Sequence, residues 1–381
     1  MIFFEKYDFL NNKNTNRYNI YYLEKSFGTS FEQQRWILKY IDYYKTAKIS
    51  NLYTEQIKTE IQNKNVSTSA FNVWYHDFKT TNTLLHNRAD IEVFYWIDGL
   101  GIDWIPFISH LLEEKKDEKI YLNEIYIARA QYPSTTEVNK KSLLELSNDK
   151  LLKTGDLDNF AHKTGNKYPN YILEEIEIVK NAIHDILTEY AGKKIAIVSD
   201  HGLTALSQLC DGLNMAGVTS DHSGRIAKRT IGKCVSNTDF VVCEDEITMC
   251  ALRHESLCGK VPVGQSVHGG CTPEEVLVPI FIISSQPNVK NWTAKLIRNE
   301  ISGTNPVVEY SISGLSSSDI PFVMYNNKRY ELTLQKDRIY ISDRLNLVEN
   351  IANITLNIRN DCQTFKLQIN IGAEGDDLFN I

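Results

Sequence analysis

Six side chains in the middle of the sequence are of the types that hold transition-metal ions. They are aspartates and histidines in short polar stretches: Asp98 in IDGLG, Asp158 and His162 in DLDNFAH, Asp200 and His201 in VSDHG, and His268 in VHGG. Mixed imidazole and carboxylate ligands suit zinc or manganese better than calcium, which prefers oxygen alone. Two such ions about 4 Å apart can serve phosphoryl transfer, one at the nucleophile and the other at the leaving oxygen. These six residues are therefore candidate ligands for such chemistry, with zinc expected first and manganese second.

A nucleophile for this reaction is present in the segment YPSTTEVNK. Three adjacent hydroxyls occur there, on Ser134, Thr135 and Thr136. A threonine hydroxyl is a poor nucleophile at neutral pH, whereas coordination to a divalent cation favours its alkoxide. In-line attack on phosphorus would give a phosphothreonine, which water would then hydrolyse. The residue types alone leave the choice among the three hydroxyls open.

Two of the candidate ligands follow apolar runs that are typical of buried parallel strands. The run IEVFYWIDGLG ends at Asp98, and a second strand is predicted over Lys194–Ser199, just before Asp200. The segment Tyr168–Tyr190 has apolar residues at helical spacing and is predicted to be the crossover between parallel strands. The fold class is therefore predicted to be α/β, a sheet with helices on both faces. Ligands of such sheets bind beyond the carboxyl ends of the strands, where Asp98 and Asp200 both fall.

The rest of the chain divides by composition into three parts. Residues 1–85 are rich in Tyr, Asn and Lys, and Ser30–Lys48 has helical periodicity, which predicts a helical N-terminal segment. Residues 86–286 hold the candidate site and end in another apolar strand, Val276–Ser284. Residues 287–381 contain short alternating runs, with a hairpin turn expected at Asn326-Asn327, and predict an antiparallel β domain of the sandwich kind.

Composition and charge limit the classes of function. The chain has 381 residues, 42% of them hydrophobic, which is typical of a globular protein with several cores. It has no run of about 20 apolar residues, and its first residues lack the features of a signal peptide, so we expect a cytoplasmic protein that does not enter the membrane. The net charge of −7 provides no overall basic field for nucleic acid, so a polyanionic substrate would need local positive charge, for which bound metals are one source.

The order of the candidate ligands resembles that of the alkaline-phosphatase superfamily. In particular HGGCTPEEVLVPIFI, with ARAQYPSTTEVNK upstream, is similar to the PglZ domain of bacterial BREX phage-defence systems. The resemblance covers residues 90–285 approximately. It implies an alkaline-phosphatase-like sheet sandwiched by helices over residues 86–286, between the helical segment and the β domain.

The resemblance also implies a role for each candidate residue. One metal would be held by Asp98, Thr136, Asp200 and His201, and the other by Asp158, His162 and His268. Thr136 would be the nucleophile because it follows Pro133 in the family's Pro-x-x pattern. Asn139 would support the phosphate.

The activity that this resemblance implies is hydrolysis of a phosphodiester, in a nucleotide or nucleic acid, with other phage-defence proteins as partners. A sulfatase is disfavoured because no Cys-x-Pro-x-Arg or Ser-x-Pro-x-Arg lies near the nucleophile. A phosphosugar mutase is not excluded, but the flanking β domain gives it no support.

Each candidate residue also has a structural alternative. Asp98 could begin an Asp-Gly turn, Asp200 could cap a helix, and His268 could be a hydrogen-bonded loop residue. Asp156 is a rival to Asp158 as the ligand from DLDNFAH.

The segment Thr219–Arg229, TSDHSGRIAKR, repeats the Asp-His dipeptide. It reads first as a surface loop and next as a loop with basic residues that face phosphate. Arg225 is the candidate substrate-binding residue from it. A second metal-ligand pair there is a third interpretation.

A different class of function remains open as well. The chain could be an assembly module of a defence complex, with a structural or weakly active metal site. The tyrosine-rich N-terminal helices and the β domain would then provide surface for partners.

Overall fold

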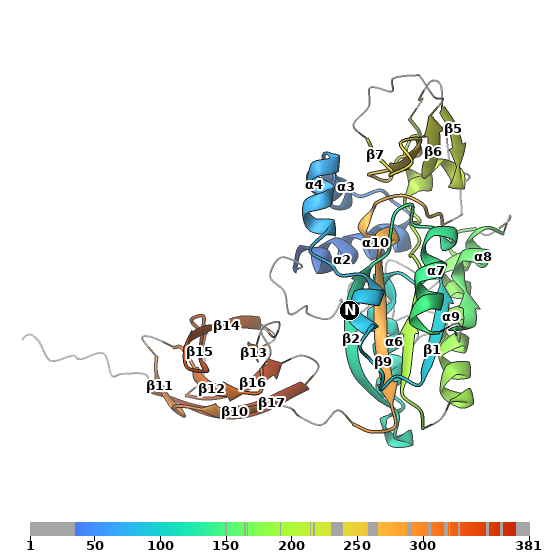
Figure 1. Ribbon diagram of the computed structural model, residues 1–381. Helices are drawn as coiled ribbons and strands as arrows, with labels where there is room; N and C mark the ends of the chain where they lie inside the picture. The colour runs from blue at the N-terminus through green and yellow to red at the C-terminus, as the bar shows by residue number, and fades with distance from the viewer. Residues whose placement is uncertain are drawn as a thin grey trace, which may run out of the picture. The chain divides into compact units, whose positions relative to one another are not determined.

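The computed structural model describes the chain from residue 35 to residue 370 with short gaps. The described ranges are 35–148, 151–163, 165, 167–190, 192–213, 215, 218–229, 239–257, 266–287, 292–303, 306–315, 319, 321–326, 328–347, 350–358 and 361–370. They divide into two compact units, one up to residue 287 and one from residue 292 onward (Figure 1).

The first unit is built on a five-stranded sheet with the strand order β2-β9-β4-β1-β3. Its strands are β1 (Val93–Asp98), β2 (Tyr121–Arg129), β3 (Leu151–Asp156), β4 (Ile195–Val198) and β9 (Leu277–Ser284). Strand β1 runs parallel to β3 and β4, whereas β9 runs antiparallel to β4 and β2. The two strands predicted to deliver Asp98 and Asp200 are therefore parallel neighbours.

Helices cover both faces of this sheet, as predicted. Alternate residues of each strand point to opposite faces, so that Ile97 belongs to one hydrophobic cluster and Trp96 to the other. One cluster includes residues of α6 (Ile105–Glu113) and α9 (Asn170–Glu189), and the other includes residues of α5 (Thr81–Leu85) and α7 (Thr136–Leu146). Helix α9 lies in sequence between β3 and β4, which both pair in parallel with β1. This confirms the predicted crossover.

The N-terminal helices pack into the same core as the sheet. These helices are α2 (Arg35–Ser50), α3 (Glu55–Lys64) and α4 (Thr68–Tyr75). Their buried apolar residues belong to the larger cluster. The Tyr44 hydroxyl donates to the Leu203 carbonyl at 3.0 Å, and the Asn65 amide donates to the Cys271 carbonyl at 3.1 Å. The helical segment thus supports the loops that follow Asp200 and His268.

A second, four-stranded antiparallel sheet lies in sequence between β4 and β9. Its order is β5-β6-β8-β7, with β5 (Val218–Asp221), β6 (Ile226–Arg229), β7 (Phe240–Val242) and β8 (Thr248–Ala251). The expectation of a surface loop over Thr219–Arg229 is therefore wrong, because that segment forms the β5–β6 hairpin. Each strand has three or four residues, too few for alternation to be seen in the sequence. The strands are held by a small separate apolar cluster that includes Ala227 and Met249.

Short helices complete the first unit. They are α8 (Leu157–Ala161), α10 (Pro273–Val276) and the 3-10 turns η3 (Ile102–Trp104), η4 (Lys116–Glu118), η5 (Ser207–Leu209) and η6 (His222–Gly224). Within the described residues, none of the helices has the length and apolar character needed to cross a membrane.

The second unit is one curled eight-stranded sheet around its own apolar core. The strands are β10 (Thr293–Leu296), β11 (Glu300–Ser302), β12 (Glu309–Ser313), β13 (Phe322–Tyr325), β14 (Lys328–Lys336), β15 (Ile339–Ser342), β16 (Ile351–Ile358) and β17 (Asp361–Asn370). Strands β13 and β14 pair in the predicted antiparallel hairpin, with Tyr325 opposite Lys328, while Asn327 of the predicted turn lies outside the described residues. All its pairs are antiparallel except β11–β17, which is parallel. The expected sandwich of two stacked sheets is replaced by a single sheet that curls.

Candidate metal centre

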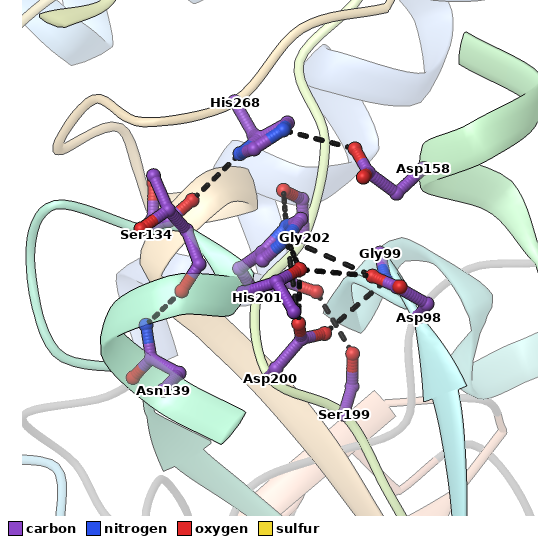
Figure 2. A network of polar contacts seen from close by, with 12 residues as sticks. Asp98, Gly99, Ser134, Asn139, Asp158, Ser199, Asp200, His201, Gly202 and His268 are labelled. Atoms are coloured by element: carbon purple, nitrogen blue, oxygen red, sulfur yellow. Dashed lines mark hydrogen bonds and ion pairs between the residues drawn. The ribbon is translucent and has the colours of Figure 1, made fainter. Parts of the chain in front are cut away.

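The candidate ligands come together beyond the carboxyl ends of β1 and β4. Asp98 is the last residue of β1, and Asp200 and His201 follow β4, the strand beside it. Figure 2 shows their side chains gathered at one point, with Asp158 and His268 next to them. Neighbouring parallel strands end at the same edge of a sheet, and this brings residues from distant parts of the sequence together.

Four polar atoms converge in the first part of the centre. The Thr136 hydroxyl donates to Asp200 Oδ2 at 2.8 Å and lies 3.4 Å from Asp98 Oδ1. It also lies 3.2 Å from His201 Nε2. His201 Nε2 is 3.5 Å from Asp200 Oδ2 and 3.7 Å from Asp98 Oδ1. Two carboxylates and one imidazole nitrogen thus surround the Thr136 hydroxyl, and these donor types could hold a divalent cation.

The second part of the centre is a group of one aspartate and two histidines. Asp158 is on α8 and His162 is its C-cap, four residues on, so both side chains lie on one face of the helix. Asp158 Oδ1 is 2.9 Å from His268 Nε2 and 3.3 Å from His162 Nε2. The two Nε2 atoms are 3.3 Å apart. This group also has the donor atoms and the spacing to hold a metal ion.

The two parts adjoin each other. The rings of His201 and His268 stack with centroids 4.1 Å apart and planes 13° from parallel. Asp158 also groups with Asp98 and His201, with one ligand atom from each within 4.8 Å of the others.

The orientation of the two stacked histidines favours ligation through Nε2. His201 Nδ1 is 3.1 Å from the Gly202 carbonyl, and His268 Nδ1 is 2.9 Å from the Ser134 carbonyl. A carbonyl can only accept, so each Nδ1 carries a proton, and in the neutral form of each ring Nε2 presents a lone pair to the centre. Histidines that bind metals are commonly oriented in this way by a backbone carbonyl.

The two carboxylates of the first part are harder to ionise than usual, although Lys153 pairs with Asp98. Burial and the adjacent Asp200 carboxylate raise the pKa of Asp98 to about 6. Burial also raises the pKa of Asp200, and burial together with His268 lowers the pKa of His201 to about 3. Buried carboxylates that resist ionisation beside a neutral imidazole are a donor set whose charge a metal ion would offset.

In the second part, the negative charge of Asp158 is stabilised by its two histidine partners. Burial acts to raise the pKa of Asp158, but hydrogen bonds from His162 and His268 lower it below its ordinary value. The same contacts with Asp158 raise the pKa of His162. For His268 they outweigh burial, so its pKa is raised as well.

Among the three candidate hydroxyls, it is that of Thr136 which reaches the centre. Ser134 is fully buried, and its Oγ donates to the Gly270 carbonyl and accepts from the Gly269 amide, both at 2.9 Å. Thr135 is the extended residue that precedes α7. Ser134 therefore joins its segment to the loop of His268, and Thr136 is the residue whose hydroxyl faces the candidate ligands.

The structure also separates Asp158 from its rival Asp156. The Asp156 side chain caps α8 by accepting from the Asn159 amide at 2.7 Å. It also forms an ion pair with Lys153 at 2.8 Å. Asp156 thus positions the helix that carries Asp158 and His162.

Asn139 is placed behind the nucleophile segment. Its side chain accepts from the Gln131 amide at 2.7 Å and donates to the carbonyls of Gln131 and Thr135 at 3.0 Å. These bonds hold the chain just before Thr136, so the contacts favour support of the segment over direct contact with phosphate.

Arg225 is fully buried away from solvent, in an ion pair. Its guanidinium donates to Glu275 Oε1 at 3.0 Å and Oε2 at 2.7 Å, and to the Glu255 carbonyl at 2.9 Å. Glu275 also accepts from the Gly270 amide at 3.0 Å. The contacts of Arg225 favour a structural role, in which it links β6 to the loop after His268.

Replacing Arg225 by methionine is expected to lower the free energy of unfolding by about 3 kcal/mol. Removal of one partner of a buried pair costs roughly 3–5 kcal/mol, and the lower end applies because Glu275 keeps the Gly270 and Thr272 bonds. Urea unfolding measures this decrease in the free energy of unfolding, with Lys115→Met as the control. Lys115 forms a partly exposed pair with Glu118, whose loss should cost less than about 1 kcal/mol. Equal losses in both variants would contradict the structural role.

Two residues that contact the centre were not identified from the sequence. The Trp96 indole donates to Asp200 Oδ1 at 3.0 Å, and the Lys153 ammonium donates to Asp98 Oδ2 at 2.7 Å. Both hold the outer oxygen of a candidate ligand, so that the other oxygen faces the Thr136 hydroxyl. Trp96 lies two residues before Asp98 on the same strand, a spacing that could have suggested it. Lys153 lies on β3, a strand that the sequence did not indicate.

Gly202 allows two of the loops to approach closely. A Cβ at this position would lie 2.1 Å from the Glu274 carbonyl oxygen, and the Gly202 amide donates to the Glu275 carbonyl at 2.9 Å. The loop after Asp200-His201 is thereby fixed against the segment that follows His268.

Neither the protein-family models nor the curated proteins compared with this chain match it. What the centre can do is therefore inferred from its own geometry.

Proposed function

We propose that this chain is a metal-dependent phosphoester hydrolase that uses Thr136 as its nucleophile. The observation that supports this most strongly is the position of the Thr136 hydroxyl, within 3.4 Å of Asp98, Asp200 and His201. A half-buried threonine with no chemical role does not need two carboxylates and an imidazole around it. A nucleophile that is activated by a cation does.

In this proposal two cations are bound. One is held by Asp98, Thr136, Asp200 and His201, and the other by Asp158, His162 and His268. Zinc is the first expectation and manganese the second, because both accept nitrogen and oxygen ligands together. Bound cations would supply Lewis acidity that favours the alkoxide of Thr136 and stabilises negative charge on the leaving oxygen.

The chain's own groups orient the attack. Thr136 is the first residue of α7, so a phosphate at its hydroxyl would also meet the amides and the positive end of the helix dipole. Asp200 Oδ2 accepts a hydrogen bond from the Thr136 hydroxyl. The Trp96 indole donates to Asp200 Oδ1 and holds the carboxylate in this orientation. The bond from Thr136 Oγ1 to phosphorus would form as the bond to the leaving oxygen breaks. Water would then cleave the phosphothreonine, releasing phosphate or a phosphomonoester.

A phosphodiester is favoured over a monoester as the substrate. A diester carries one negative charge, whereas a monoester carries nearly two at neutral pH. The nearby cationic side chains are already engaged, Lys153 with Asp98 and Asp156, and Arg225 with Glu275. A substrate with less charge to neutralise suits this arrangement better.

The broader assignment rests on resemblance. The order of the candidate ligands and the parallel β1 and β4 strands are consistent with an alkaline-phosphatase-like fold of the PglZ type. Such an enzyme would act on nucleotides or nucleic acid in bacterial phage defence, beside other defence proteins. Fold analogy alone does not identify a substrate, so this step depends on the test of the chemistry.

Metal content and diester hydrolysis test the proposal together. Elemental analysis of the purified protein is expected to find about two equivalents of zinc or manganese. Bis-p-nitrophenyl phosphate should then be hydrolysed faster than p-nitrophenyl phosphate. Absence of metal after reconstitution would refute the ligand assignment and leave an assembly module as the better interpretation. Two bound metals without hydrolysis of either ester would also favour an assembly module over an enzyme.

A further inference from the structure

The tip of the β5–β6 hairpin has an unusual backbone. Three consecutive residues, His222, Ser223 and Gly224, have positive φ angles of 47°, 53° and 84°. Left-handed conformations cost roughly 1–2 kcal/mol for residues other than glycine. Two non-glycine residues in a row therefore require that the surrounding structure hold the turn in place. Such conformations gather at functional sites.

The hairpin tip is anchored from several sides. The Leu257 amide donates to the Gly224 carbonyl at 2.7 Å, and the Ala251 amide donates to the Arg225 carbonyl at 2.9 Å. The buried guanidinium of Arg225 then ties the tip to Glu275, which also accepts from the Gly270 amide. The Glu275 carboxylate therefore accepts hydrogen bonds from both the hairpin tip and the loop that carries His268, and it fixes the two segments relative to each other.

This anchoring places His222 against the second part of the metal centre. The rings of His222 and His268 meet edge to face, with centroids 4.8 Å apart. A Cβ on Gly269, whose φ is 112°, would lie 2.7 Å from Ile226 and 3.4 Å from the Cβ of His222, so glycine permits the close approach. The His222 side chain is still 27% exposed, which leaves it accessible to a ligand.

We propose that His222 is a substrate-contacting residue, which hydrogen-bonds the phosphate ester at the group formed by Asp158, His162 and His268. This inference rests on the proposed function and deepens it. A zinc ion with three protein ligands keeps a fourth position for an external ligand. His222 Nδ1 lies 3.2 Å from Asp221 Oδ1, so the proton for a phosphate oxygen would come from Nε2. His222 comes from the separate four-stranded sheet, and its contact with the centre is through the His268 ring.

Direct binding of inorganic phosphate to the zinc-loaded protein tests this without turnover. The variant is His222→Gly, because glycine adopts the positive φ without strain and removes only the ring. Isothermal titration is expected to show phosphate binding weakened by about 10-fold or more, the size expected for a lost hydrogen bond to a charged group. His222→Asn, whose side chain also tolerates this backbone, should weaken binding in the same direction. His184→Ala on α9 serves as the control and should bind as the wild type does.

The outcomes separate the two proposals. Unchanged phosphate affinity in His222→Gly would overturn the role of His222 while leaving the proposed function intact. Loss of one zinc equivalent in that variant would also overturn it, because His222 would then bind the cation and not the phosphate. A wild-type protein that binds neither zinc nor phosphate would remove the proposed function, and this inference with it.

Discussion

Replacement of Thr136 by alanine is expected to lower the rate of phosphodiester hydrolysis by more than about 10³-fold, the scale seen when a catalytic nucleophile is removed. In the proposed reaction the phosphoryl group is transferred to the Thr136 hydroxyl. The side chains of Asp98, Asp200 and His201 all lie within 3.4 Å of that hydroxyl. The loss of one half-buried hydroxyl should leave the fold intact. Initial rates with bis-p-nitrophenyl phosphate, together with circular dichroism, measure both effects.

Two further variants make this prediction specific. Thr136→Ser keeps a hydroxyl at the same place and should retain measurable hydrolysis. Thr135→Ala removes the neighbouring hydroxyl, whose side chain makes no capping hydrogen bond to α7, and should keep nearly the full rate. The nucleophile assignment would be wrong if Thr135→Ala abolished hydrolysis and Thr136→Ala did not. Partner binding that survives Thr136→Ala, in a protein that never hydrolyses the diester, would favour the assembly module.

Replacement of Asp158 by alanine is expected to remove about one equivalent of metal and also to lower the hydrolysis rate by more than about 10³-fold. Asp158 Oδ1 is the atom that His162 and His268 share, at 3.3 and 2.9 Å. Without it, two imidazoles remain, and a cation held by two ligands in place of three binds far more weakly. The reaction would then lose the stabilisation of its leaving oxygen. Elemental analysis and rate measurements on the same preparation provide both numbers.

Asp156→Ala is the matched control for this prediction, since Asp156 lies two residues away. Asp156 caps α8 and pairs with Lys153, so its loss should destabilise the protein by about 1 kcal/mol and leave both metal equivalents bound. If Asp156→Ala lost a metal while Asp158→Ala kept both, the two roles would have to be exchanged.

Local patterns in the sequence were enough to predict the central architecture. The apolar runs before Asp98 and Asp200 are buried strands, and the amphipathic segment before β4 is helix α9. These features depend on residues that are near each other in the chain, so that periodicity and length identify them. The hairpin between β13 and β14 was predictable for the same reason, because its turn residues are adjacent.

The choice among neighbouring side chains could not be made in this way. Ser134, Thr135 and Thr136 are equivalent as hydroxyls in sequence, and Asp156 and Asp158 are equivalent as carboxylates. Which of them faces the centre depends on where α7 and α8 begin relative to the ends of β1 and β4. Helix caps and hydrogen bonds to distant loops decide this, such as the bond between Ser134 and Gly270.

What the sequence by itself determined is the strands that precede Asp98 and Asp200, the strand Val276–Ser284, the crossover helix between the parallel strands and the candidate ligands, because hydrophobic periodicity and residue chemistry are local properties. Only the tertiary structure decided that Arg225 is a buried partner of Glu275, that Lys153 holds Asp98, and that the hairpin of His222 lies against His268. These contacts join residues that are about 46 to 55 positions apart in the sequence. Their energies depend on burial, which exists only after the chain has folded.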